Sequence, residues 1–220
     1  MIYIIFVILI FSTGSTNYFQ VTYNEKVNLS TSELKSFSSD VKNSIENTKR
    51  YYVLQTNGNQ SIFYKDTTIH SGNIAFNSSK VMDLVYFKNF DTKSMALYDK
   101  LTPNCVAGTK SSLLVADDWT VTNETKQIGQ YKTRKATIQL NDVLYTAYFT
   151  DEISLYDGPK NFCGLPGLII RLESGNTVLE MVKIEKLPST FALRIPEIHQ
   201  WLSEKAFEKY KKDKLAGISK

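Results

Sequence analysis

The sequence has few of the residue types that most often build metal and nucleophilic sites. It contains two cysteines and two histidines in 220 residues, and Cys105, Cys163, His70 and His199 are too scattered for a zinc site, which needs close ligand spacing. It also lacks a Gly-x-Ser-x-Gly elbow, a Gly-rich phosphate loop and a His-Glu-x-x-His helix. The sequence therefore predicts no metal, no cofactor and no serine hydrolase of the α/β class.

No apolar run is long enough to span a membrane. The longest run, Ile2 to Phe11, has ten residues, whereas a membrane-spanning helix needs about 20. Small and polar residues follow it, which is typical of a signal peptide over residues 1–16, cleaved after Gly14 or Thr16. The segment before the run has no Lys or Arg, so an uncleaved anchor is the alternative. We expect an exported protein.

Positive charge is also scarce outside the C-terminus. The formal net charge is +4, and residues 204–220 supply +3 of it with six lysines against three acidic residues. The rest of the chain is nearly neutral, whereas nucleic-acid binding needs many cations clustered on one face. The composition therefore excludes a nucleic-acid-binding domain.

The two cysteines have two interpretations. Export permits a disulfide between Cys105 and Cys163, which would stabilise the fold by closing a long loop. The alternative is a pair of buried thiols too far apart to meet.

The sequence is rich in aromatic residues and in segments that are typical of β-strands. Tyr and Phe number thirteen and twelve, and such residues favour sheets. Residues 51–55 and 61–64 flank an Asn-Gly turn, and two more predicted hairpins cover 135–150 and 168–187. Apolar residues also alternate at Phe19, Val21 and Tyr23, and further strands are expected at 84–90, 94–100 and 119–122.

Two segments have helical rather than alternating spacing. Apolar residues recur three or four apart between Ser30 and Lys49, where Ser30 and Glu33 match a capping box, and again after Pro196, at Trp201, Leu202, Phe207 and Tyr210. Because short turns join consecutive strands, we predict a mainly β fold. It is one domain, residues 17–220, with a single curved antiparallel sheet, an open half-barrel-like meander, and a helix near each end.

The densest turn chemistry lies between the last two hairpins. Five of the thirteen residues from Asp157 to Ile169 are Gly or Pro, which predicts a rigid corner. It either seals one end of the sheet or grips a ligand or partner. The candidate binding residues are those of the corner and one nearby tryptophan: Gly158, Pro159, Phe162, Gly164, Leu165, Pro166, Gly167, Leu168, Ile169 and Trp119.

The hexapeptide of residues 164–169 resembles the signature of the GLPGLI family of exported proteins, found mainly in Bacteroidota. Blocks at 119–121, 126–131, 135–137, 148–153 and 158–162 resemble the family's other recurring segments, so the resemblance covers roughly residues 115–187. It implies a place in the periplasm or at the outer-membrane periphery of a Gram-negative bacterium, and an outer-membrane β-barrel transporter as partner. It implies no catalytic residues.

From these observations we expect a non-enzymatic protein that docks on an outer-membrane β-barrel. One alternative is a carrier or chaperone for an apolar ligand or peptide, suggested by the curved sheet. A second is a thiol-dependent enzyme using Cys163, for which Lys160 would supply the positive neighbour that activates a thiolate. A third is an envelope subunit without a small ligand.

Overall fold

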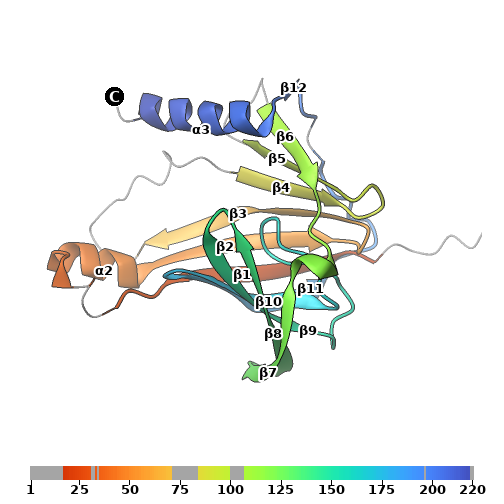
Figure 1. The fold of residues 1–220 in the computed structure, drawn as a ribbon, viewed down its shortest axis with the longest axis horizontal. Helices are drawn as coiled ribbons and strands as arrows, with labels where there is room; N and C mark the ends of the chain where they lie inside the picture. Colours follow the sequence, from red (N-terminus) through yellow and green to blue (C-terminus); the bar gives the residue numbers. More distant parts are fainter. Residues whose placement is uncertain are drawn as a thin grey trace, which may run out of the picture.

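The computed structural model describes residues 17–30, 33, 35–70, 84–99, 107–195 and 197–218. The predicted leader, residues 1–16, and Cys105 lie outside these residues. The described part forms one open sheet of twelve strands (Figure 1) in the order β12-β6-β5-β4-β3-β2-β1-β11-β10-β9-β8-β7. Its strands are β1 (Phe19–Val27), β2 (Thr48–Thr56), β3 (Gln60–His70), β4 (Leu84–Asn89), β5 (Ser94–Asp99), β6 (Ala107–Ser112), β7 (Thr120–Ile128), β8 (Tyr131–Leu140), β9 (Val143–Thr150), β10 (Leu168–Ser174), β11 (Thr177–Lys186) and β12 (Gln200–Trp201).

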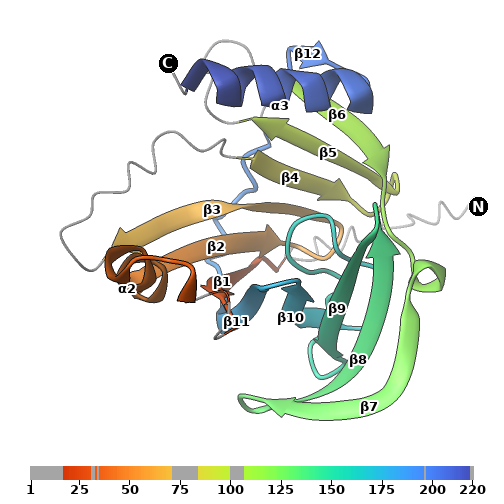
Figure 2. The same ribbon diagram turned by 60° about the vertical axis from the view of Figure 1, so that its left-hand side comes forward.

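Neighbouring strands pair antiparallel except at one edge, where β12 runs parallel to β6. The sheet is strongly curved, and β7, β8 and β9 bend away from the plane of β2 and β3 (Figure 2). The predicted fold class, mainly β with one curved open sheet, is confirmed. Every predicted strand is present, whereas β6 and β12 were not predicted.

Both α2 (Ser39–Asn47) and α3 (Glu204–Ile218) begin later than their patterns predicted. The first, α2, starts at an N-cap Ser38 whose side chain accepts from the Val41 N–H. The capping box of Ser30 and Glu33 forms, with the Ser30 N–H donating to Glu33 Oε2 at 2.8 Å, but it lies ahead of α2. From Thr48 the chain turns into β2, which pairs with β3 from Thr48 onward and with β1 from Arg50 onward. Its aromatic and β-branched residues favour a strand.

The second helix, α3 (Glu204–Ile218), begins after the residues that were expected to start it. Trp201 lies in β12 instead, with the Lys110 ammonium 4.2 Å from its ring centroid. Phe207 is buried, and the Tyr210 hydroxyl donates to Asp99 Oδ2 at 3.3 Å. These two contacts dock the helix on the β5–β6 end of the sheet.

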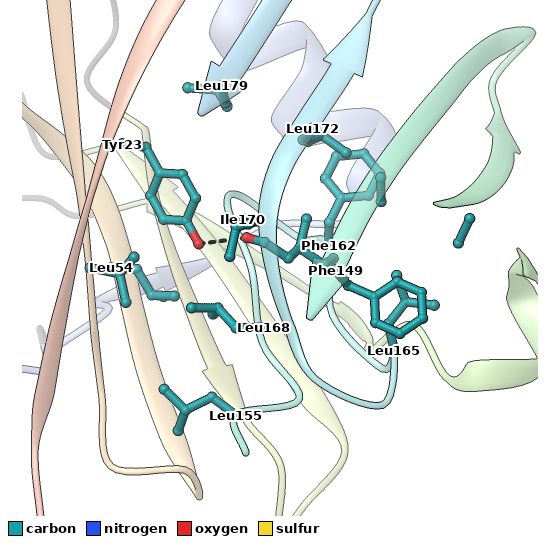
Figure 3. Close-up of a cluster of buried hydrophobic side chains, with 14 of the residues drawn as sticks. Tyr23, Leu54, Phe149, Leu155, Phe162, Leu165, Leu168, Ile170, Leu172 and Leu179 are labelled. Carbon is teal, nitrogen blue, oxygen red and sulfur yellow. Dashed lines mark hydrogen bonds between the residues drawn. The ribbon is translucent and has the colours of Figure 1, made fainter. Parts of the chain in front are cut away.

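The main core lies on the concave face and includes a loop. The loop between β9 and β10, residues 151–167, is called the clasp. Its side chains Leu155, Phe162 and Leu165 pack with Phe149, Leu168 and other sheet residues in one cluster (Figure 3). The open concave face of the sheet is therefore filled by the clasp, which agrees with the sealing interpretation of the corner.

Two glycines of the clasp are required by space as well as by backbone conformation. A Cβ at Gly164 would lie 2.6 Å from Leu114 O, and one at Gly167 would overlap Thr150 O. Both residues have positive φ, +88° and +142°, a region that other residues reach only at a cost. The corner sequence therefore follows from close backbone packing.

We predict that Gly167→Ala lowers the free energy of unfolding by about 3 kcal/mol or more, because backbone strain and overlap with Thr150 add together. Urea unfolding of the purified protein measures the change. Gly129→Ala is the matched control, since Gly129 also has positive φ but no atom within 4 Å of an added Cβ. The control should lose only about 1–2 kcal/mol. Equal losses would show that close packing at Gly167 is unimportant.

Candidate functional site

Three side chains of the surrounding structure hold the clasp by its backbone. Lys88 Nζ in β4 donates to Gly158 O at 2.7 Å, and Trp119 Nε1 donates to Cys163 O at 3.0 Å. The Tyr23 hydroxyl in β1 donates to Ile169 O, just beyond the clasp, at 2.8 Å (Figure 3). Buried carbonyls need such donors, so these bonds fix the clasp at three points.

A buried ion pair joins the clasp to β4. Lys88 Nζ contacts Asp157 Oδ1, and the two side chains are 0% and 2% exposed. The Gly158 N–H also donates to Asp157 Oδ1, at 2.7 Å. Because an unpaired charge is costly away from water, each member of the pair depends on the other.

The binding residues predicted from the sequence gather around the clasp, and almost all of them lie in the interior. Gly164 is half-buried, and Pro166 is the one exposed residue among the ten. The buried ones are Gly158, Pro159, Phe162, Leu165, Gly167, Leu168, Ile169 and Trp119. A partner approaching from outside would therefore meet Pro166 first. Binding through any of the ten residues stays a prediction.

Cys163 is a free, buried cysteine, so the disulfide, one of the two interpretations of the cysteines, is wrong for this structure. Cys163 belongs to the clasp, and its Sγ lies 3.5 Å from Leu114 O. Burial raises the pKa of Cys163 to about 11, against the opposing effect of nearby Lys88. At neutral pH the group is therefore a protonated thiol and a poor nucleophile.

The outer face of the sheet carries a pocket. The segment 187–195, here called the strap, leaves β11 and leads toward β12, so in this strand order the connection crosses β1 to β6. Between the strap and the strands lies a pocket of about 570 Å³, a size typical of small-molecule sites. Its lining residues come from β2 to β5 and the strap: Gln55, Ile62, Tyr64, Val85, Tyr98, Phe191, Arg194 and Ile195.

The pocket combines aromatic walls with polar groups. Burial raises the pKa of Tyr98, and burial with nearby Asp66 raises that of Tyr64, so both phenols stay protonated and able to donate. Gln55 Nε2 donates to Gln20 Oε1 at 2.9 Å, which orients its amide. Arg194 is exposed on the strap and supplies a guanidinium. Such a site can hold a molecule with flat apolar faces and a rim of hydroxyls.

Sequence reasoning missed all eight of the described residues that line this pocket. They span residues 55 to 195 and meet only because the strap passes over β2 to β5 on its way across the sheet. One signal was available: Phe191, Leu193 and Ile195 alternate with Ala192 and Arg194, directly after the turn at Pro188. This alternation indicates that the strap packs against the sheet instead of linking two elements through solvent.

Two further features concern metals and membranes. The described residues contain no group of three or more His, Cys, Asp and Glu side chains able to hold a metal. Neither helix of the described ranges has the length and apolar character of a membrane span.

Comparison with known proteins identifies the family. The family model for the "N-glycanase peptide, N-terminal domain" matches residues 18–202, so the chain belongs to this family. No curated protein matches the chain.

Solved structures show the same fold. The structure of PNGF-II in the C2 space group has a TM-score of 0.62 at 16% sequence identity, covering 92% of this chain and 33% of its own. The structure of PNGF-II in the P21 space group has a TM-score of 0.63 at 14% identity, covering 90% and 34%. The chain thus spans about a third of the length of these structures.

Family membership overturns the GLPGLI assignment. The matched family model covers residues 18–202, far more than the segments on which that resemblance rested. The hexapeptide that suggested it is explained by packing, because Gly164 and Gly167 have no room for a side chain and Leu165, Leu168 and Ile169 are buried. A short motif required by packing does not identify a family.

The expectation of a non-enzymatic docking protein is also wrong, because the matched family is named for an enzyme. The motifs that the sequence lacks belong to other hydrolase classes, and their absence does not bear on this family. The thiol-enzyme alternative is not supported either, because Cys163 is buried with a raised pKa. Family membership is consistent with export, and no finding bears on the outer-membrane β-barrel partner, which stays a prediction.

We predict that Cys163 resists alkylation in the folded protein and reacts once the protein is denatured, because burial blocks access and keeps the thiol protonated. Iodoacetamide labelling of a Cys105→Ser variant near pH 8, followed by mass spectrometry, isolates this residue. Rapid labelling of the native protein would show that the clasp opens or that the thiol is activated.

Proposed function

We propose that this chain is the N-terminal part of an N-glycanase-type protein and that its outer-face pocket binds a sugar of the substrate glycan. Family membership supports the first part. The pocket between the strap and strands β2 to β5 is the observation that carries the second. Any glycanase activity belongs, in this proposal, to the whole protein, and the pocket contributes by holding the glycan.

The chemistry of the pocket suits a carbohydrate. A sugar ring has apolar C–H faces that pack on aromatic rings, and Tyr64, Tyr98 and Phe191 provide such rings. Its hydroxyls need donors and acceptors, which the Gln55 amide, the Arg194 guanidinium and the two phenols offer. The volume of about 570 Å³ leaves room for one or two sugar rings and excludes most of a branched glycan.

The walls of the pocket favour binding without large rearrangement. Gln55, Tyr64, Val85 and Tyr98 sit on four adjacent strands held by antiparallel ladders. Rigid walls reduce the entropy that binding must overcome. The strap supplies Phe191 and Arg194 from the other side, so a bound sugar would contact sheet and strap together.

We further propose that the protein acts in the periplasm or at the outer-membrane periphery. The apolar leader and its small-residue cleavage region support this location. Fractionation of cells that produce the full chain would test it, and recovery with the cytosolic fraction would overturn it.

The binding proposal predicts that Tyr64→Ala and Arg194→Ala each weaken binding of an N-linked glycopeptide about tenfold, because each removes one wall or donor. Isothermal titration calorimetry with the glycopeptide and with the same peptide lacking its glycan measures the effect. The unglycosylated peptide should not bind.

Tyr156→Ala is the matched control. Tyr156 is also a tyrosine, 62% exposed on the clasp and outside the pocket, so this variant should bind as tightly as the parent. Equal binding by all three variants, or no binding by the parent chain, would overturn the pocket assignment.

A further inference from the structure

The buried pair of Lys88 and Asp157 differs from an ordinary salt bridge in its burial and in its hydrogen bonding. The two side chains are in contact and 0% and 2% exposed. Moving a carboxylate and an ammonium out of water is costly, and their attraction repays that cost only if the remaining polar atoms are also satisfied. They are not, because Asp157 Oδ2 is buried and has no hydrogen-bond partner among the described residues.

Gly158 binds both members of the pair. Its carbonyl accepts from Lys88 Nζ at 2.7 Å, and its N–H donates to Asp157 Oδ1 at 2.7 Å. One carboxyl oxygen is therefore held by two donors, whereas the other has none. Oδ1 is thus held in place by hydrogen bonds, whereas Oδ2 is the oxygen that is free to leave.

We propose that Lys88 and Asp157 are joined by an isopeptide bond. The resulting amide would keep both contacts with Gly158, since its N–H replaces the ammonium as donor to Gly158 O and Oδ1 stays as its carbonyl oxygen. The two buried charges disappear. The oxygen without a partner, Oδ2, is the one released.

The reaction balances without another reactant. The Lys88 ammonium first gives a proton to the Asp157 carboxylate, and the amine lone pair then attacks Cγ. The C–N bond forms, the bond from Cγ to Oδ2 breaks, and Oδ2 leaves as water with two of the three protons of Nζ. The pair is neutral overall before and after, and nothing is oxidised or reduced.

The surroundings favour this condensation. The charge of Asp157 acts on the Tyr23 and Cys163 side chains, and burial is the main cause that raises the pKa of both groups. Neither group therefore brings a competing charge at neutral pH. The Tyr23 hydroxyl is engaged with Ile169 O. Little water reaches such a site, which slows hydrolysis of the bond once it has formed.

An isopeptide bond would tie β4 covalently to the clasp. Like the disulfide considered from the sequence, it would stabilise the fold by closing a long loop. Unlike a disulfide, it would not need an oxidising compartment. The cross-link lies on the concave face, away from the outer-face pocket, so its presence or absence does not depend on the proposed function.

Peptide mapping of the denatured parent chain tests the proposal. Trypsin should fail to cleave after Lys88, and residues 81–93 should appear joined to residues 136–160, lighter than the sum of the two peptides by one water. Asp157→Asn should give the same joined product, because it releases ammonia in place of water. Lys88→Arg should give the separate peptides, because a guanidinium does not condense in this way.

Two results would overturn the proposal, and neither requires a variant to fold. One is an unmodified mass with normal cleavage after Lys88. The other is the loss of one water with normal cleavage after Lys88, which would indicate a succinimide at Asp157-Gly158 instead of a cross-link.

Discussion

The structure depends on how the clasp is held against the concave face of an open sheet. A curved sheet presents a concave apolar surface, and burying it is worth about 25 cal/mol for each Å² removed from water. The clasp covers this surface but brings backbone carbonyls with it. Lys88, Trp119 and Tyr23 donate to those carbonyls or to the one just beyond. The clasp can thus cover the concave face with apolar side chains because side-chain donors satisfy its buried carbonyls.

Of the three donors, Lys88 carries the largest consequence. It is the one that is charged, and its partner Asp157 belongs to the clasp itself. Removing either member of a buried ion pair typically costs about 3–5 kcal/mol, since the other charge is left in the interior. The ion pair therefore specifies where the clasp sits, whether or not it goes on to form a covalent bond.

The core face and the pocket face are coupled through shared strands. On β3, Phe63 points into the main core, while its neighbours Ile62 and Tyr64 line the pocket. Alternation along a strand places successive side chains on opposite faces. A register shift of one residue would exchange the two sets. The packing of the clasp on one face therefore also fixes the geometry of the pocket on the other.

The sequence predicted those parts of the fold that rest on local signals. Alternation and an Asn-Gly turn located β2 and β3, and the same reasoning located the hairpins that lead into and out of the clasp. It did not locate β6, because Ala107–Ser112 consists of small and polar residues with no apolar alternation. It extended α2 too far, because the pairing of β2 with β3 that starts at Thr48 is a tertiary constraint that local spacing does not encode.

The candidate site could not be predicted for a related reason. Its residues come from four strands and a strap that are brought together by topology, whereas the corner that attracted functional interpretation is a contiguous motif. A tight turn such as Leu165-Pro166-Gly167 is built from residues that are adjacent in the sequence, so close backbone packing leaves a contiguous motif. A ligand instead needs side chains that converge from different elements, and those are separated in sequence. In this fold the most conspicuous local pattern therefore marks the clasp, and the residues suited to recognition are those whose sequence surroundings are unremarkable.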